Sequence, residues 1–167
     1  CVCLFGMQVV TSYLSRNLKL DFYWGAEQHF FDNYSDENLR NLEIARLDDL
    51  YYAKTGTRLY KITSGGSDVV GTLGFVNAAF ELKQQIAAGL LPEPDYIYVT
   101  LGSCGTAAGL ILGIKASGLK TIVVPVCIEE EENPTHAAKL VTLATGANNN
   151  LIKADPTFPK ITLTEKD

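Results

Sequence analysis

The stretch "YVTLGSCGTAAGLILGIKASGLKTIVVPVC", residues 98–127, decides the fold. Apolar runs at 96–100 and 121–127 are typical of buried strands, and they flank a glycine-rich turn and an apolar stretch with helical spacing. The helix is expected to begin near Thr106 and to end at Gly118, because glycine commonly follows a helix. A strand, a helix and a second strand in this order predict two parallel strands joined by a helical crossover.

The same alternation runs through the whole chain. Further strands are expected at 2–5, 28–31 and 58–63, and further helices at about 10–25, 36–55, 75–88 and 134–147. Ser35 is the expected N-cap of the second helix, and Gly25 and Gly56 are expected to end the first two. The tail from Asn148 has turn composition. The strands are continuous apolar runs, so we expect an α/β fold: a parallel sheet with helices on both faces.

Composition and charge exclude several classes of protein. The chain has 167 residues, of which 47% are apolar and 20% charged, so a disordered chain is not expected. A net charge of −5 without a basic run argues against a nucleic acid or an anionic membrane as partner. No apolar run is long enough for a membrane span, and no secretory leader is evident. Because an apolar strand starts at once at Cys1, we expect a piece of a longer protein.

The chain offers little for a metal site. It has four cysteines and two histidines, Cys1, Cys3, Cys104, Cys127, His29 and His136. No two cysteines form a C-x-x-C pair, so we expect reduced thiols of a cytoplasmic protein and no metal. His29 is expected at a strand edge and His136 in an exposed position, and the acidic run 129–132 is expected to be a solvated loop. Trp24 is expected in the core or in an interface.

The turn after the predicted strand 96–100 has the composition of an anion site. Its residues are Gly102, Ser103, Cys104, Gly105 and Thr106. Unpaired backbone N–H groups and the positive end of the helix dipole converge at such a point, where they bind phosphate. The serine and threonine hydroxyls can add donors. Ligands of open parallel sheets also bind at the carboxyl ends of strands, where this turn lies.

Other interpretations of the turn stay open at this point. It is not a Walker A sequence, and it is not G-x-G-x-x-G, since Gly102 and Gly105 are three residues apart. Glu129 could still imitate the ribose-binding acid of a dinucleotide site. The turn could also serve packing alone, with the glycines of the following helix letting two backbones approach. A nucleophilic Cys104 is a further alternative, although no base is near it in the sequence.

A second glycine loop strengthens the phosphate interpretation. The sequence "TSGGSDVVGTLGFVNAAFEL", residues 63–82, again follows a predicted strand and opens a predicted helix. Because the carboxyl ends of neighbouring parallel strands lie at one edge of a sheet, two such loops would form facing walls of one pocket.

These motifs also resemble a known family. "GGSDVVGTLGFVNAAFEL" (65–82) followed by "PDYIYVTLGSCGTAAGLILGIK" (94–115) resembles the aminocyclopropane-carboxylate deaminase and D-cysteine desulfhydrase family. These are fold-type II pyridoxal-phosphate enzymes related to tryptophan synthase β subunits. "RNLKLDFYWGAEQHFF" (16–31) resembles a segment of their smaller domain. The resemblance extends from Cys1 to about Val126.

The resemblance implies a cofactor site. In this family a turn like 102–106 holds the phosphate of pyridoxal 5′-phosphate through backbone amides and a hydroxyl, and Gly65, Gly66 and Ser67 would border the same pocket. Cys104 departs from the glycine that is usual in the family. We expect that change to be tolerated if the φ angle at this position is negative.

The resemblance also implies an activity: a pyridoxal-phosphate-dependent lyase or deaminase of amino-acid metabolism, acting on a small amino acid as a homodimer. Residues 1–56 would belong to the smaller domain and 57–167 to the larger, cofactor-binding domain. The lysine that binds the cofactor as a Schiff base would precede this region, so the chain alone is expected to be inactive. Alternatives are a non-catalytic phosphate- or nucleotide-binding α/β module and a serine or threonine dehydratase-like enzyme.

Overall fold

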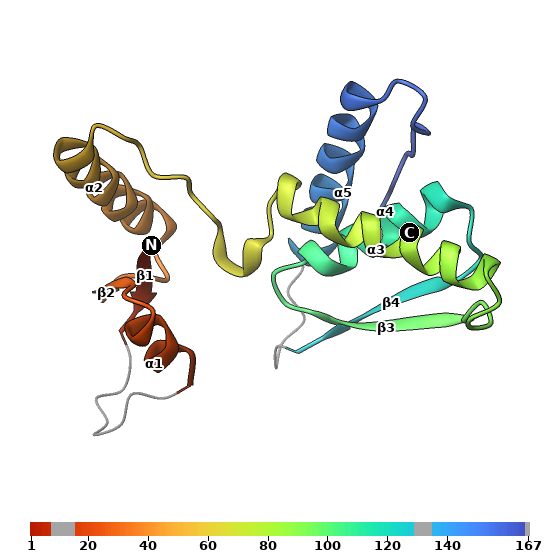
Figure 1. The fold of residues 1–167 in the computed structure, drawn as a ribbon, viewed down its shortest axis with the longest axis horizontal. Helices are drawn as coiled ribbons and strands as arrows, with labels where there is room; N and C mark the ends of the chain where they lie inside the picture. The colour runs from red at the N-terminus through yellow and green to blue at the C-terminus, as the bar shows by residue number, and fades with distance from the viewer. Residues whose placement is uncertain (8–15, 129–134, 166–167) are drawn as a thin grey trace. The chain divides into compact units, whose positions relative to one another are not determined.

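The computed structural model describes residues 1–7, 16–128 and 135–165 (Figure 1). The chain divides into two compact units, Cys1–Lys61 and Ile62–Asp167, which we call the N-terminal and the C-terminal unit. In chain order the elements are β1 (Val2–Gly6), α1 (Arg16–Tyr23), β2 (Glu27–Phe31), α2 (Glu37–Thr55), the 3-10 turn η1 (Ser64–Gly66), α3 (Val69–Ala87), β3 (Tyr96–Leu101), α4 (Gly105–Ser117), β4 (Ile122–Cys127) and α5 (Thr135–Ala154). No helix in these described ranges is long and apolar enough to cross a membrane.

In the N-terminal unit, β1 and β2 form a parallel pair in a register that places Val2 opposite Glu27. Helix α1 ends at Tyr23, and Gly25 follows it with a φ angle of 73°, as predicted for a helix stop. The first part of the predicted helix, 10–15, lies outside the described residues.

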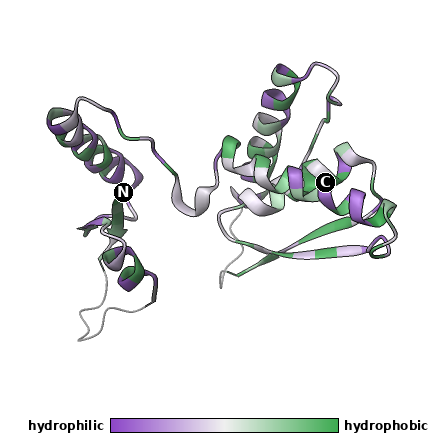
Figure 2. Cartoon of the chain, in the orientation of Figure 1, coloured by the Kyte–Doolittle hydropathy of each residue, from purple (hydrophilic) through white to green (hydrophobic). Residues whose placement is uncertain are grey.

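Helix α2 begins one residue later than predicted. Its N-cap is Asp36, whose carboxylate accepts the N–H of Leu39 at 3.1 Å, so the prediction of Ser35 as the cap is wrong. Aspartate and serine are equally good N-caps, so residue type alone could not separate them. Gly56 ends the helix in the left-handed conformation, as predicted. Leu47 is the buried residue of α2, and Figure 2 shows the helix banded in hydrophilic and hydrophobic colours.

Aromatic side chains at the end of α1 are exposed. Phe22, Tyr23 and Trp24 expose 68%, 77% and 79% of their surface in the N-terminal unit. A core position for Trp24 is therefore wrong within this unit, and its place in an interface stays a prediction.

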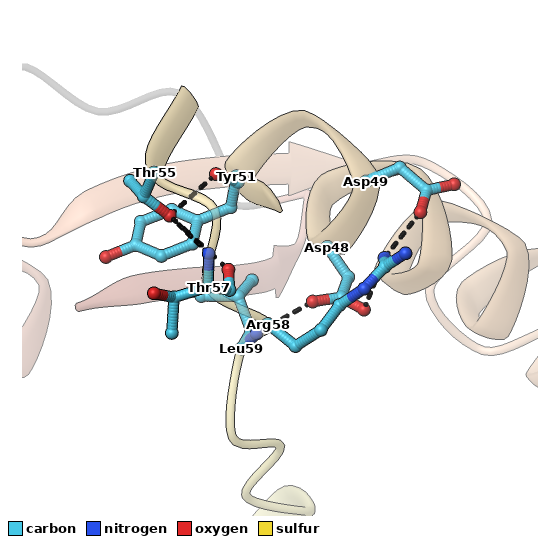
Figure 3. Close-up of polar contacts among 7 residues, drawn as sticks. All are labelled: Asp48, Asp49, Tyr51, Thr55, Thr57, Arg58 and Leu59. Atoms are coloured by element: carbon cyan, nitrogen blue, oxygen red, sulfur yellow. Dashed lines mark hydrogen bonds and ion pairs between the residues drawn. The ribbon is translucent and has the colours of Figure 1, made fainter. Parts of the chain in front are cut away.

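Residues 58–63 do not form the predicted strand. At the start of this segment, side chains of α2 bind the Leu59 N–H and the Arg58 side chain (Figure 3). The Leu59 N–H donates to Asp48 Oδ1 at 2.7 Å. The Arg58 guanidinium donates to Asp48 Oδ2 at 3.1 Å and to Asp49 Oδ1 at 2.6 Å. Together these bonds hold the chain against its own helix. We call this set of contacts the α2 clamp.

In the C-terminal unit, β3 and β4 form the parallel pair that the sequence predicts. The register places Tyr96 opposite Ile122 and Leu101 opposite Cys127. Figure 1 shows α3 and α4 on one side of this pair, and Figure 2 shows β4 hydrophobic along most of its length. The α/β class with parallel strands is confirmed. On the opposite face of the pair, Tyr98 and other large side chains are exposed in the described chain.

Helices α3 and α4 approach each other closely because glycines stand at their crossing. A Cβ atom at Gly109 would lie 2.5 Å from the Thr72 carbonyl oxygen. One at Gly113 would lie 2.6 Å from the Ala79 Cβ and 2.8 Å from the Val76 carbonyl oxygen. Real Cβ contacts are almost never so short, so these positions admit no side chain without a shift of the backbone.

The hydrophobic core lies where α3, α4, α5 and the C-terminal segment meet. Its buried residues are Val76, Leu101, Cys104, Ala107, Ala108, Leu112, Leu143, Ala144, Ala147 and Leu163. Leu112 is fully buried at its centre. A second cluster of Ala79, Ile114 and Val123 joins α3 and α4 to the sheet. Small residues dominate α4, so the helix can lie deep in the unit.

Two helix boundaries in this unit differ from the prediction, the start of α3 and the end of α5. Helix α3 begins at Val69 rather than Phe75, because the Asp68 carboxylate accepts the N–H groups of Val70 and Gly71 and starts the helix within the glycine loop. Helix α5 continues past Asn148 to Ala154.

Two polar residues of α5 are buried. The side chain of Asn148, only 2% exposed, donates to the Pro159 carbonyl and accepts the Ile161 N–H, both at 3.0 Å. These bonds fasten the C-terminal segment to the helix, which a reading of turn composition could not foresee. His136 is also buried, so its predicted exposure is wrong.

Candidate phosphate-binding site

The candidate site begins where β3 ends. Three residues after Leu101 separate the strand from α4, whose first residue is Gly105. We call residues 102–106 the phosphate loop. Its N–H groups lie at the N-terminus of a helix of 13 residues, where the helix dipole favours negative charge. The predicted position of these residues, between the carboxyl end of a parallel strand and a helix, is what the structure shows.

Cys104 takes an unexpected conformation in this loop. It is the N-cap of α4 with a φ angle of 75°, in the left-handed region, so the condition of a negative φ under which cysteine was expected to be tolerated is not met. A non-glycine residue in this region costs about 1–2 kcal/mol. The thiol lies in the core with 3% of the residue exposed, and its Sγ is 3.5 Å from the Gly102 carbonyl oxygen. Burial of the side chain offsets the strain and hides the thiol from solvent, which speaks against a nucleophile.

The backbone donors of the phosphate loop are only partly engaged. The Gly105 N–H donates to Ser67 Oγ at 3.2 Å. Within the described ranges, the N–H groups of Ser103 and Thr106 make no hydrogen bond. Ser103 is exposed and Thr106 half-buried, so their hydroxyls can reach a ligand at the loop. The loop therefore offers amide and hydroxyl donors that the helix itself leaves unused.

The second glycine loop lies directly against the first. Ser67 Oγ is 2.7 Å from Ser103 Oγ, so residues 36 positions apart in the sequence meet side chain to side chain. Gly65 and Gly66 have φ angles of 68° and 60°, which glycine adopts without strain. The prediction that the two loops face each other agrees with this geometry. That Gly65, Gly66 and Ser67 line a cofactor pocket stays a prediction.

The contact leaves no room for added side chains. A Cβ atom at Gly65 would lie 2.5 Å from Ser103 Oγ, and one at Gly105 would lie 2.6 Å from Ser67 Oγ. At Gly71 it would lie 1.9 Å from the Gly66 carbonyl oxygen. Glycine at these positions therefore lets the two loops lie close together, against serine side chains at Gly65 and Gly105 and against the backbone at Gly71. A phosphate monoester fits this donor set.

Asp68 is the residue of this region that the sequence reasoning missed. One oxygen of its carboxylate, Oδ1, accepts the N–H groups of Val70 and Gly71 at 2.9 and 2.8 Å. Asp68 thereby fixes the start of α3 directly after Ser67. The available signal was an aspartate directly before an apolar helical run, which is a common N-cap pattern.

Other candidates give little. The described residues contain no group of three or more histidine, cysteine, aspartate or glutamate side chains placed to hold a metal ion. His29 pairs locally with Glu27 at 2.9 Å. Glu129 and the acidic run 129–132 lie outside the described residues. An apolar cavity of about 190 Å³ lies between α4, β4, α5 and residues 163–165, and none of its lining residues belongs to the phosphate loop.

Comparison with known proteins gives a consistent result. Residues 4–165 match the family described as "Pyridoxal-phosphate dependent enzyme". The chain is 31% identical over 142 residues to a D-cysteine desulfhydrase of Yersinia enterocolitica, which covers 80% of this chain and 41% of that protein. It is 35% identical over 115 residues to the mitochondrial bifunctional D-cysteine desulfhydrase/1-aminocyclopropane-1-carboxylate deaminase of Arabidopsis thaliana, covering 66% of this chain and 28% of that protein.

A solved structure supports the same likeness. The crystal structure of an ACC deaminase homologue matches this chain with a TM-score of 0.70 and 26% sequence identity, over 90% of this chain and 42% of that one. The chain thus spans less than half the length of the relatives it matches. The resemblance predicted from the motifs at 65–82 and 94–115, and the fold expected from it, are confirmed.

Proposed function

Because the chain belongs to the family of pyridoxal-phosphate dependent enzymes, we propose that its phosphate loop holds the cofactor phosphate of a lyase or deaminase for a small amino acid. D-cysteine and 1-aminocyclopropane-1-carboxylate are the proposed substrate types, since the relatives that the chain resembles carry these names. The observation that carries the proposal is the meeting of the two glycine loops at the start of α4.

The residues of the loop have separate roles in this proposal. Ser103 and Thr106 offer backbone N–H groups and hydroxyls to the phosphate, and the amides of Gly102 and Cys104 belong to the same turn. Gly105 closes the turn, with its N–H on Ser67 Oγ. Such charge-assisted hydrogen bonds are about twice as strong as neutral ones. When bound, pyridoxal phosphate supplies a ring that accepts electrons from the substrate's α-carbon. The protein's part here is to anchor and orient that ring by its phosphate.

The rest of the active site is proposed to come from outside this chain. None of the chain's lysines stands in the sequence context expected of the cofactor-binding lysine. We therefore assign that lysine to the part of the relatives that this chain does not span. By itself the chain would then bind phosphate without catalysis. Residues 1–56 are proposed to belong to the smaller domain of the whole protein and 57–167 to its larger domain. A homodimer in the cytoplasm is the proposed assembly.

The test uses the full-length protein. Purified protein is expected to show the visible absorbance of lysine-bound pyridoxal phosphate, and borohydride should abolish it. Release of ammonia and sulfide is then measured with D-cysteine, and release of ammonia with 1-aminocyclopropane-1-carboxylate, L-serine and L-threonine. Activity on L-serine or L-threonine alone would favour a dehydratase. A colourless protein that binds phosphate without the cofactor would instead point to a non-catalytic binding module.

Sedimentation analysis of the same sample tests the proposed assembly. A mass of twice the chain of the full-length protein is expected, and a monomer at micromolar concentration contradicts the homodimer.

A further inference from the structure

Ser67 connects two loops that are distant in the sequence. Its hydroxyl donates to Ser103 Oγ at 2.7 Å and accepts the Gly105 N–H at 3.2 Å. Gly105 is the first residue of α4, so its N–H is one of those that a helix leaves without an internal partner. The Ser67 hydroxyl, in the loop before α3, thus accepts a backbone N–H of the phosphate loop.

The position of this hydroxyl is fixed from both sides. Gly65 and Gly66 precede it with left-handed φ angles, and Asp68 follows it as the N-cap of α3. A Cβ atom placed at Gly105 would lie 3.1 Å from the Ser67 Cα, so the backbones of the two loops lie close together at this point. The side chain therefore has little freedom to turn away from the phosphate loop.

From this geometry we infer that Ser67 is a positioning residue of the phosphate site. It orients the Ser103 hydroxyl and, by accepting the Gly105 N–H, fixes the start of α4 in the arrangement that phosphate needs. Affinity for the phosphate group thus depends on a residue that lies outside the 102–106 turn. The inference rests on the proposed function, because it assigns Ser67 a role toward the phosphate that the loop is proposed to bind.

A physical reason links position to affinity. A loop that is already ordered before its ligand arrives loses less conformational entropy on binding. Without the Ser67 hydroxyl, the Ser103 side chain and the first amide of α4 lose their shared partner and must be ordered by the ligand. The expected loss of affinity concerns the phosphate group of the ligand, because Ser103 and Gly105 both belong to the phosphate loop.

The test separates phosphate affinity from ring affinity. Calorimetric titration of the cofactor-free, full-length protein uses 4′-deoxypyridoxine 5′-phosphate, which has the phosphate but no aldehyde for a lysine, and 4′-deoxypyridoxine, which lacks both. The quantity of interest is the ratio of the two affinities. Ser67→Ala is expected to lower this ratio by about tenfold, as the loss of a hydrogen bond in a charged site does. Affinity for the phosphate-free ligand should be unchanged.

Ser64→Ala is the matched control. Ser64 belongs to the same turn, and its side chain is exposed. The same substitution there should leave the ratio at the wild-type value. An equal loss in both variants would mean that the turn as a whole matters and would overturn the role of Ser67. Should Ser67→Ala fail to fold, Ser67→Cys keeps a weak donor and acceptor in similar volume, and an intermediate loss is expected.

A double-mutant cycle tests whether Ser67 acts through Ser103. If it does, Ser67→Ala and Ser103→Ala together lower the ratio by less than the product of the single effects. Independent effects of the two substitutions overturn the inference. A wild-type protein that binds both ligands equally refutes the proposed function itself. A wild type that prefers the phosphate ligand, with an unchanged ratio in Ser67→Ala, refutes only the role of Ser67.

Discussion

The two units of the chain bury their side chains to very different degrees. The C-terminal unit surrounds Leu112 with small residues of α4 and apolar residues of α3 and α5, and its glycines let the helices touch. In the N-terminal unit Leu47 is the buried apolar residue of its long helix, while Trp24 and its neighbours are exposed. The C-terminal unit is therefore held by packing, and the N-terminal unit by strand pairing and polar contacts such as the α2 clamp.

The largest expected effect is in the core of the C-terminal unit. Leu112→Ala removes a fully buried side chain and should lower the free energy of unfolding of this unit by about 3 kcal/mol. Urea denaturation of the full-length protein measures the change. The matched control is Leu42→Ala in the N-terminal unit, where the side chain is exposed, and a change within about 0.5 kcal/mol is expected. Equal effects would show that the two units do not differ in packing.

A pair of glycine substitutions sharpens the comparison within one unit. Gly113→Ala places a methyl group 2.6 Å from the Ala79 Cβ and should lower the free energy of unfolding by about 2 kcal/mol. Gly74→Ala, in α3, meets nothing within 4 Å and should raise it by about 0.5–1 kcal/mol, because alanine favours the helix. The same substitution is thus expected to lower the free energy of unfolding at one position and to raise it at the other. Changes of the same sign at both positions would contradict the close contact between α3 and α4.

The C-terminal segment depends on one amide. Asn148→Ala removes the two hydrogen bonds to Pro159 and Ile161 and should cost about 1.5 kcal/mol, since it leaves part-buried backbone groups without partners. Faster hydrogen exchange at the Ile161 amide should accompany it. Asn149→Ala, at the neighbouring exposed position, is the control and should change neither quantity. Unchanged exchange at Ile161 in Asn148→Ala would contradict the role of the amide.

The smallest effect concerns the α2 clamp. The hydrogen bond from the Leu59 N–H, followed by those from Arg58, holds the pKa of Asp48 below its usual range. A lowered pKa in the folded state means that the clamp stabilises the protein above the aspartate's ordinary pKa and that this contribution is lost as the pH falls below it. Hydrogen exchange at the Leu59 amide, corrected for its intrinsic pH dependence, should lose protection on acidification and in Asp48→Ala at neutral pH. Asp49→Ala should leave it protected, because the Asp49 carboxylate bonds to Arg58 while the Leu59 N–H donates to Asp48.

Sequence reasoning succeeded where local chemistry decides the structure. The strands around α4 and the stops at Gly25, Gly56 and Gly118 follow from apolar runs and from glycine's access to positive φ. It failed where a distant partner decides. Residues 58–63 resemble a strand, but the Leu59 N–H is bound by Asp48 and the Arg58 side chain by Asp48 and Asp49.

The same holds for the candidate site. The phosphate loop was predictable from its own residue types. The second glycine loop does meet it, but not for the predicted reason, because the strand expected at 58–63 is absent. The positive φ of Cys104 was not, because it depends on the core that receives the thiol. Asn148 looks like a turn residue until Pro159 and Ile161 are seen beside it.

The contact between Ser67 and Ser103 limits where residues can be inserted into the chain or deleted from it. One residue added within α3 would rotate everything before it by about 100° around the helix axis, so Ser67 would leave Ser103 although both helices still formed. The exposed turn between α3 and β3, by contrast, can lengthen without turning either partner. Residues 93–95 bond to residues 120–122. Related sequences should therefore vary in length at residues 89–92 and keep a constant count of residues from 67 to 87.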